Sequence, residues 1–358
     1  MNTFGNIFRV GIFGESHGEE IGVVIDGVEP GIELSPADFE ADIARRRSGA
    51  KGTTPRIEAD EPRILSGVYD GCTTGAPLTI VFRNTNTRSQ DYDRLKDVPR
   101  PGHADFTANI KYGGFQDPRG GGHFSGRLTL PVVAAGVVAK KVLRETVAEE
   151  THGHVQFRCD ARLVEVGGIT DSARWEAALD AARQEGDSLG GVVECTVDGI
   201  PAGLGGPFWD SVESCLSHAL FAIPGVRGVE FGDGFAAARK KGSEHNDCFA
   251  PAETCPCGDP DCQEGHEGLV TPATNHAGGI NGGITNGMPL VVRMAMRPTA
   301  SIATEQRTVD LRTMEDATLR THGRHDPCLA VRAIPVMEAA LAISVLDAIL
   351  ERNAYQQF

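Results

Sequence analysis

Short stretches of the chain alternate between apolar and polar residues, and longer stretches place apolar residues at helical spacing. The first pattern predicts strands at 7–13, 21–26, 78–83, 191–198 and 289–296. The second predicts helices at 36–47, 126–150, 172–184, 211–221 and 328–353. Because strands and helices follow one another without regular β-α alternation, we expect an α+β fold rather than a doubly wound parallel sheet. Neither a repeat nor a linker divides the chain, so 1–358 is predicted to be one domain.

Three of the predicted helices carry signals at or near their ends. Ser35 and Asp38 are placed as the two members of a capping box at the first helix. Asp210 and Glu213 are expected to cap the helix that follows them. Pro335 lies inside the last predicted helix, and because proline lacks an N–H we expect it to kink or split that helix.

Composition and charge narrow the class of protein. The 358 residues carry a net charge of -15 with ordinary fractions of apolar and charged residues. Binders of nucleic acid or of membrane surfaces work through a basic surface, so neither partner is expected. No apolar run approaches about 18 residues, and the N-terminus lacks the pattern of a secretion signal. We therefore predict a cytoplasmic protein in which any anionic ligand meets a local group of arginines.

The cysteines form one dense group. Nine are present, an odd number that argues against a disulfide framework. The segment 247–269 contains Cys248, Cys255, Cys257 and Cys262, with His266 nearby. These side chains are sufficient in kind for tetrahedral zinc, but they lack the paired C-x2-C spacing of known zinc motifs. An exposed loop insertion with reduced cysteines is favoured, and no bound metal is predicted.

A run of three glycines precedes one of the predicted helices, in 119-RGGGHFSGRLTLP-131. Glycines let the backbone approach a ligand closely, and a helix N-terminus carries partial positive charge. This stretch is therefore a candidate cradle for an anion. A long polar loop, 84–106, lies upstream, and loops of that length inside compact domains are more often functional than not.

Ionisable residues collect on loops beside glycine and proline. They occur at 14-GESHG-18, 100-RPGHAD-105 and 323-GRHDP-327, where side chains can converge on a pocket. Taken singly, a loop histidine is more often an ordinary surface residue. The arginines at 45–47 either compensate the dipole of the helix that they end or belong to a pocket for a polyanion.

In this order, the motifs resemble those of the chorismate synthase family along essentially the whole chain. They are GESHG, RRR at 45–47, TRSQDY at 87–92, RPGHADF, the glycine run, GDSLGG at 186–191, PAGLG at 201–205, VEFGDGF at 229–235, NHAGGINGG at 275–283, RPTASI at 297–302 and GRHDP. The resemblance implies a sandwich with helices packed between antiparallel sheets, assembled as a homotetramer. It also implies a lyase that eliminates phosphate from 5-enolpyruvylshikimate 3-phosphate in a 1,4-anti sense to give chorismate. Such enzymes require reduced FMN, although the reaction has no net redox change.

The resemblance also assigns roles to individual residues. His17 matches the histidine that protonates the flavin, His103 the one that protonates the departing phosphate, and Asp326 the carboxylate that assists loss of the ring proton. Positions matching flavin contacts are His123, Phe124, Ser125, Glu244, His245, Gly282, Arg297, Pro298, Thr299, Ala300, Ser301 and Arg324. Positions matching contacts to anionic substrate or to NADP are Arg46, Lys51 and Arg127.

The glycine run departs from the usual family pattern in the residues that follow it. Arg-Ser-Ser-Ala-Arg-Glu-Thr is the common sequence, whereas this chain has 123-HFSGRLT-129. An active synthase with a variant flavin loop is favoured. A flavin-binding protein that has lost the elimination is the alternative. NADPH is a further candidate, as the reductant of the flavin, used either by this chain itself or through a separate flavin reductase.

Overall fold

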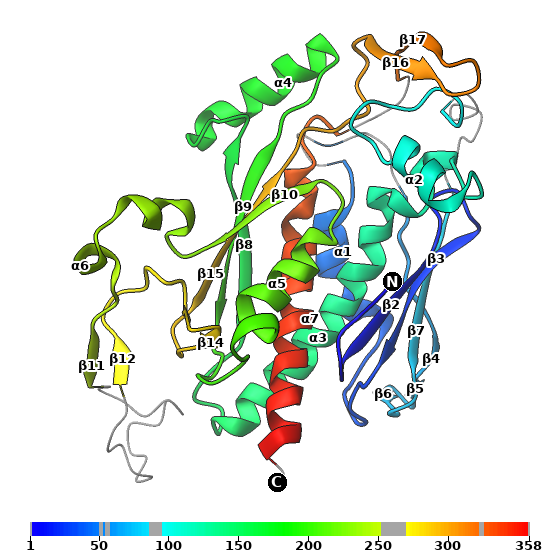
Figure 1. Cartoon of the computed structure of the whole chain (residues 1–358). Helices are drawn as coiled ribbons and strands as arrows, with labels where there is room; N and C mark the ends of the chain where they lie inside the picture. Colours follow the sequence, from blue (N-terminus) through cyan, green and yellow to red (C-terminus); the bar gives the residue numbers. More distant parts are fainter. Residues whose placement is uncertain are drawn as a thin grey trace.

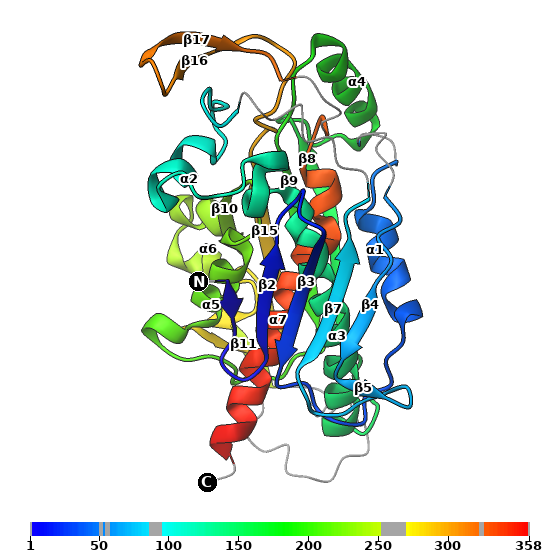
Figure 2. The ribbon, with the colours of Figure 1, turned by 90° about the vertical axis from the view of Figure 1, so that its right-hand side faces the viewer.

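Two antiparallel sheets enclose a layer of helices in the computed structural model, which describes residues 2–49, 53, 58–85, 95–251, 270–321 and 326–356 (Figure 1). The first sheet has the strand order β1 (Thr3–Phe4), β2 (Arg9–Gly14), β3 (Glu20–Asp26), β7 (Leu78–Arg83) and β4 (Arg63–Ser66). Figure 2 shows these strands side by side. The second sheet has the order β10 (Val226–Phe231), β15 (Leu290–Met296), β9 (Gly191–Asp198) and β8 (Arg158–Val166).

Two long helices form the middle layer. Helix α3 (Thr129–Glu150) packs on β3 and β7 of the first sheet, and α7 (Ala330–Gln356) packs on β8 and β9 of the second. The two helices also pack on each other, and one cluster of buried apolar side chains runs through all three layers. The α+β class, with helices between antiparallel sheets, is therefore confirmed.

The crossing of α3 and α7 depends on Gly136. A Cβ atom added to this residue would lie 2.2 Å from the Cβ atom of Ala339 on α7, closer than two carbon atoms can approach. Small residues at a helix crossing let the two backbones approach closely, and the apolar side chains around them then pack at high density.

Helix α7 runs without interruption through Pro335, so the predicted split of this helix is wrong. Pro335 lies near the beginning of α7, where it removes one backbone hydrogen bond, and packing against both neighbouring layers stabilises the rest of the helix. Ala330–Tyr355 is long and apolar enough to cross a membrane by length and mean composition, although Glu338 and Asp347 interrupt its apolar residues. However, 83% of its most apolar window is buried inside the protein, as is typical of a core helix.

The remaining elements surround this framework. They are the helices α1 (Glu40–Arg46), α2 (Asp105–Tyr112), α4 (Trp175–Glu185), α5 (Val212–Phe221) and α6 (Gly242–His245), and the short paired strands β5 (Val68–Tyr69) with β6 (Cys72–Thr73), β11 (Phe249–Pro251) with β12 (Val270–Pro272), β13 (Ile280–Asn281) with β14 (Ile284–Thr285), and β16 (Gln306–Asp310) with β17 (Glu315–Leu319).

Asp38 accepts hydrogen bonds from the backbone and hydroxyl of Ser35, as the capping signal predicted. At α5 the cap is Ser211, not Asp210, because the Ser211 hydroxyl accepts from the backbone N–H of Ser214.

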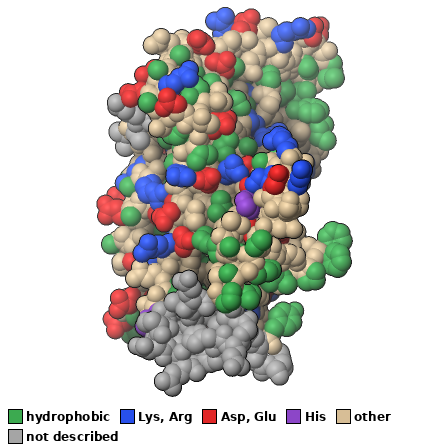
Figure 3. All heavy atoms as spheres, turned by 90° about the vertical axis from the view of Figure 1, so that its left-hand side faces the viewer, with side chains coloured by type: hydrophobic (Ala, Val, Ile, Leu, Met, Phe, Trp, Pro, Cys, Tyr) green, Lys and Arg blue, Asp and Glu red, His purple; other side chains and the backbone are tan. Residues whose placement is uncertain are grey.

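Charged side chains pair within and across the layers. On the second sheet, Arg293 lies 3.2 Å from Glu230 and 4.0 Å from Glu194 on its two neighbouring strands. Figure 3 shows basic and acidic side chains intermixed across this side of the molecule. Between the layers, Arg45 approaches the buried Glu338 of α7 to 2.6 Å. The role of Arg45 is therefore to join α1 to α7, which neither of the two interpretations of the arginine run anticipated.

Candidate active site

The glycine turn lies between two of the predicted catalytic histidines. A Cβ atom on Gly120 would lie 2.5 Å from Cδ2 of His17, and one on Gly121 would lie 3.2 Å from Cε1 of His103. Both glycines have left-handed backbone conformations, with φ of 61° and 81°. Glycine adopts these angles without steric cost, and its lack of a side chain lets the backbone pass between two imidazole rings. The structure therefore places His17 and His103 against the same turn, at two consecutive glycines.

The loop that carries His17 is held from several directions. The backbone N–H of Ser16 donates to the carbonyl of Gly122 at 3.1 Å, and Nδ1 of His123 donates to the carbonyl of Gly14 at 2.8 Å. His17 itself is only 7% exposed. His123, which departs from the usual family pattern, thus fastens the glycine turn to the loop of His17.

His103 belongs to a buried group formed by 100-RPGHAD-105. Its Nδ1 atom lies 2.7 Å from Oδ1 of Asp105. Arg100 grips the same carboxylate with both prongs of its guanidinium group, each at 2.7 Å, and its backbone N–H adds a third bond at 3.0 Å. A carboxylate held by a bidentate arginine is fixed in both position and charge.

The environment shifts the pKa values of this group in opposing ways. Burial would raise the pKa of Asp105, but hydrogen bonds from Arg100 and His103 outweigh it and hold that pKa well below its usual range. Burial lowers the pKa of His103, against the hydrogen bond to Asp105, and the charges of Arg100 and Arg297 lower it further. Asp105 is therefore ionised at neutral pH, and His103 is neutral until an anion approaches it.

Two further contacts bring the 297–301 segment to the same place. Arg100 donates to the hydroxyl of Ser301 at 3.0 Å, and Thr299 donates to the carbonyl of Asp326 at 2.9 Å. Asp326 is 8% exposed, and one of its carboxylate oxygens lies 2.8 Å from Arg332. Hydrogen bonds therefore connect the loops of His103 and Asp326 through the 297–301 segment.

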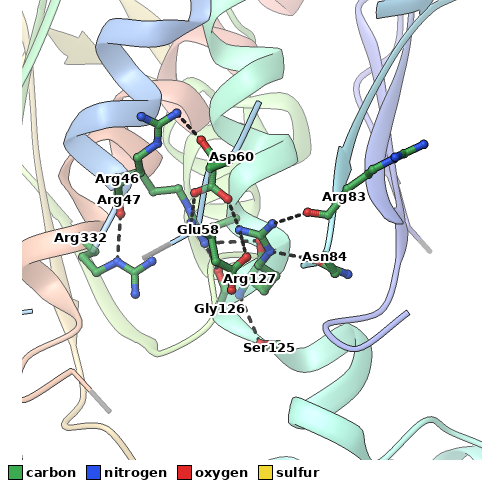
Figure 4. Close-up of polar contacts among 12 residues, drawn as sticks. Arg46, Arg47, Glu58, Asp60, Arg83, Asn84, Ser125, Gly126, Arg127 and Arg332 are labelled. Atoms are coloured by element: carbon green, nitrogen blue, oxygen red, sulfur yellow. Dashed lines mark hydrogen bonds and ion pairs between the residues drawn. The ribbon is translucent and has the colours of Figure 1, made fainter. Parts of the chain in front are cut away.

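A second cluster, of buried arginines, lies beside the beginning of helix α3 (Figure 4). Arg46 is 3% exposed, donates to Thr129 at 3.1 Å and to the carbonyl of Gly126 at 2.9 Å, and lies 3.7 Å from Asp60. Burial and the nearby charges of Arg332 and Arg127 lower its pKa to about 9. These three guanidinium groups repel one another, and the carboxylates of Glu58, Asp60 and Asp326 offset their charge.

Arg127 is already paired with carboxylates. It lies 2.9 Å from Glu58 and also pairs with Asp60, and it donates to the side chain of Asn84 at 3.0 Å (Figure 4). Asn84 in turn donates to the carbonyls of Glu15 and Gly18 on either side of His17. Through these contacts Arg127 supports the loop that carries His17.

Arg297 is a cation of a different kind. Among the described residues, no carboxylate forms an ion pair with it, and it donates to the carbonyl of Pro298 at 3.1 Å. Burial, followed by the charges of Arg227 and Arg100, lowers its pKa. A half-buried guanidinium group surrounded by like charge fits the negative groups of an anionic ligand.

Phe124 is well placed for a flat ligand. It lies at a pocket whose walls also include His103, Asp105, Gly121 and Lys96. Its ring is partly exposed, and its centroid is 6.2 Å from that of Tyr112. An exposed aromatic face beside polar groups offers a surface on which a ring system packs.

Several predicted site residues lie elsewhere. Glu244 and His245 end helix α6, which Figure 1 places on the opposite side of the molecule from α2, and His245 contacts Asp233 at 3.1 Å. Gly282 lies in the turn between β13 and β14, on the same distant side. The structure does not bring these three residues to the group around His103. Lys51 and Arg324 fall outside the described residues.

The predicted cysteine group is described only in part. Cys248 is exposed and free, and Cys255, Cys257 and Cys262 lie outside the described residues. Over the part of the chain that is described, no three histidine, cysteine or carboxylate side chains are close enough to hold a metal ion.

The sequence alone assigned no role to three residues of this region: Arg100, Asp105 and Asn84. Arg100 and Asp105 stand in the quoted RPGHAD motif, and their spacing around His103 was a usable signal. Arg332 lies about one turn into a predicted helix, where only the fold reveals that it contacts Asp326.

Histidines and carboxylates held by buried arginines, at one end of a two-sheet sandwich, are the groups with which acid–base enzymes act on anionic substrates. Comparison with known proteins gives the family. The chorismate synthase family model matches residues 8–350, and the chain belongs to this family. The identification made from the sequence motifs is thereby confirmed, and chorismate synthases are lyases.

The relatives cover the full chain. A chorismate synthase of Chitinophaga pinensis is 52% identical over 359 residues, covering 100% of this chain and 99% of its own. One of Thermococcus kodakarensis is 43% identical, with 98% of each chain covered. A crystal structure of chorismate synthase matches with a TM-score of 0.69 and 26% identity, over 97% of this chain and 93% of its own.

Proposed function

We propose that this chain eliminates phosphate and a ring proton from 5-enolpyruvylshikimate 3-phosphate in the 1,4-anti sense, which yields chorismate. Family membership supports the proposal, and one observation carries it furthest: a two-glycine turn separates His17 from His103. The turn carries no side chains, so both histidines can lie against it and act on one ligand, whereas a methyl group on either glycine would press against a ring. The proposed enzyme is a single catalytic domain, cytoplasmic and homotetrameric.

The described residues fit a flavin, and we propose reduced FMN as the cofactor. Arg297 is a half-buried cation that pairs with no carboxylate among the described residues, and Phe124 exposes an aromatic face at the pocket that His103 also lines. With Ser125 and the 297–301 segment they would hold the phosphate and ring of the cofactor. When bound, reduced flavin supplies electron density to the substrate ring as phosphate leaves.

The protein's own residues move the protons. His103 gives a proton from Nε2 to the departing phosphate, because Nδ1 is occupied by Asp105. Asp326, oriented by its ion pair with Arg332, accepts the proton released from the ring with the help of the cofactor. His17, on the other side of the turn, maintains the protonation of the flavin. Arg297, which pairs with no carboxylate among the described residues, neutralises charge on the substrate or the phosphate.

The deciding experiment is an anaerobic assay with FMN reduced by dithionite. Release of inorganic phosphate together with chorismate from the substrate is the expected result. Binding of reduced FMN without phosphate release would instead establish the alternative, a flavin-binding protein that has lost the elimination.

The source of electrons is a separate question. We propose that NADPH reduces the flavin, either on this protein or through a separate reductase. Turnover with NADPH and FMN alone, without dithionite, shows an intrinsic reductase activity. Turnover that needs an added flavin reductase assigns that step to a partner.

A further inference from the structure

We propose that Asp105 is a positioning residue, which fixes the tautomer of His103 and keeps its Nε2 atom available to carry the proton for the leaving phosphate. The inference deepens the proposed function, on which it rests. It concerns a residue to which neither the motifs nor the family resemblance gave a role.

The contact between the two side chains decides the tautomer. Oδ1 of Asp105 lies 2.7 Å from Nδ1 of His103, and an ionised carboxylate can only accept. Nδ1 therefore carries a hydrogen in both protonation states of the ring. Arg100, whose Nη2 lies 3.0 Å from the same nitrogen, could donate to it only in the opposite tautomer, which would set the lone pair of Nδ1 against the Asp105 carboxylate at 2.7 Å. Any proton that His103 gains or loses is consequently on Nε2.

The fold directs Nε2 toward the glycine turn. A Cβ atom on Gly121 would lie 3.3 Å from this nitrogen, so the backbone of the turn is its near neighbour. The opposite edge of the ring is covered by Asp105, which is itself clamped by Arg100. Three bonds from Arg100 hold the carboxylate, and the carboxylate holds the ring, so the direction of Nε2 is set before any ligand binds.

The charges around His103 come from several segments. Arg100 and Asp105 lie on its own loop, Arg297 follows β15, and Lys96 and Asp117 border the same pocket. His17 lies beyond the glycine turn. Asp105 is the one carboxylate in hydrogen-bond contact with the ring among the described residues, so it is the group that most favours the protonated form.

The proposed proton transfer from His103 to the phosphate leaves the protonation state of Asp105 unchanged. The proton on Nε2 passes to an oxygen of the phosphate as the carbon–oxygen bond breaks, and the bonding pair leaves with the phosphate. His103 becomes the neutral Nδ1–H tautomer, still hydrogen-bonded to Asp105. Asp105 remains a carboxylate throughout, and its task is to orient and stabilise the imidazolium.

The test measures the pKa of His103 directly and independently of turnover. Hydrogen–deuterium exchange at the imidazole C2 position, followed by mass spectrometry across a pH series, gives this value in the intact protein. We expect D105N to lower the pKa of His103 by about 1 unit or more, because a charge within hydrogen-bond distance is removed. D105E keeps the charge, moves it by one methylene, and is expected to stay closer to the wild-type value.

A matched control loosens the same loop without touching the pair. Thr308 donates to the carbonyl of Pro99 at 2.7 Å, and T308V removes this bond with little change in shape. If Asp105 were only structural, D105N and T308V would both lower thermal stability and leave the pKa of His103 unmoved. That result overturns the proposal.

The assay then connects the pair to the reaction. In the pH profile of kcat/KM, the alkaline limb should move to lower pH in D105N by the same shift that exchange measures, and should stay in place in T308V. A moved pKa with an unmoved alkaline limb also overturns the proposal, because His103 would not be the reacting acid. A wild-type protein that lacks turnover refutes the proposed function instead, while the exchange data still test the pairing.

Discussion

The guanidinium group of Arg332 lies 2.8 Å from the carboxylate of Asp326. The same side chain donates from Nε to the carbonyl of Arg46 at 2.9 Å, so a single arginine of α7 joins the Asp326 loop to the end of α1. Asp326 and Arg46 come from opposite ends of the sequence, and this contact gives them a fixed relative position.

Removing that connection should reduce both stability and activity. In R332A the nearly buried Asp326 loses a charged partner, which we expect to cost about 1–3 kcal/mol of unfolding free energy. R332K keeps the charge but cannot make both contacts. Its stability and activity should therefore lie between those of R332A and the wild type. Urea unfolding and kcat/KM measured on the three proteins check the order. Equal activity in R332A and wild type would contradict it.

Side chains added to the glycine turn should disturb the histidines. G121A places a methyl group 3.2 Å from Cε1 of His103 on a backbone with φ of 81°, and left-handed alanine costs about 1–2 kcal/mol. G126A is the matched control, because a Cβ atom there meets nothing within 4 Å and its φ is ordinary. Loss of turnover in G121A but not in G126A is expected. Similar losses in both variants would show that the turn itself, rather than its contact with His103, matters.

The three proposed catalytic residues should be separable from the fold. H17A, H103A and D326A are each expected to lower turnover about 10²- to 10⁴-fold, the range typical of general acid–base groups. Circular dichroism melting curves establish that the variants are folded. Normal phosphate release in any one of them would remove that residue from the mechanism.

His103 should also impose a pH dependence on stability. Its folded pKa lies below the unfolded value of 6.5, so between the two values the unfolded chain binds a proton that the folded chain does not. Stability contributed by the neutral ring is full above pH 6.5 and falls as the pH drops through that window, by at most about 1.4 kcal/mol per pH unit. Urea unfolding of H103Q should show a shallower decline, whereas H154Q, at an exposed histidine, should match the wild type.

The helix crossing offers a test within the core. G136A forces a methyl group against Ala339, and overpacking of this kind typically costs about 1–3 kcal/mol. The double variant G136A/A339G returns the lost space and should recover part of that loss. Thermal melting of the four proteins gives the coupling. Strictly additive effects would show that the two residues do not share the contact.

The fold class was predictable because the spacing of apolar residues is a property of each short segment and does not depend on how distant segments meet. The strands at 78–83 and 191–198 and the helix ending at 150 match β7, β9 and α3 within a few residues. Strand β8 was missed although 158-RCDARLVEV-166 alternates in polarity, because charged residues on its outer face weaken the apolar signal. The split expected at Pro335 failed for a different reason, since tertiary packing on both sides of α7 outweighs one missing hydrogen bond.

The site was predictable from motifs only as a set of loops. That His17 and His103 face one turn, or that Arg100 clamps Asp105, follows from how distant segments meet, and such contacts leave no periodic pattern. Arg127 shows the limit most clearly. Its position suggested an anion site, whereas Glu58 and Asp60 occupy its guanidinium group.

The contact between Gly136 and Ala339 has a bearing on chemistry that takes place far along the same helices. His17 follows a strand of the first sheet, Asp326 precedes the helix that packs on the second, and α3 and α7 are the spacer between those two sheets. The contact between the two small residues, Gly136 and Ala339, sets the distance between α3 and α7 and so the thickness of this helix layer. The separation of His17 and Asp326, the proposed proton-transfer groups, therefore depends on the absence of one methyl group deep in the core.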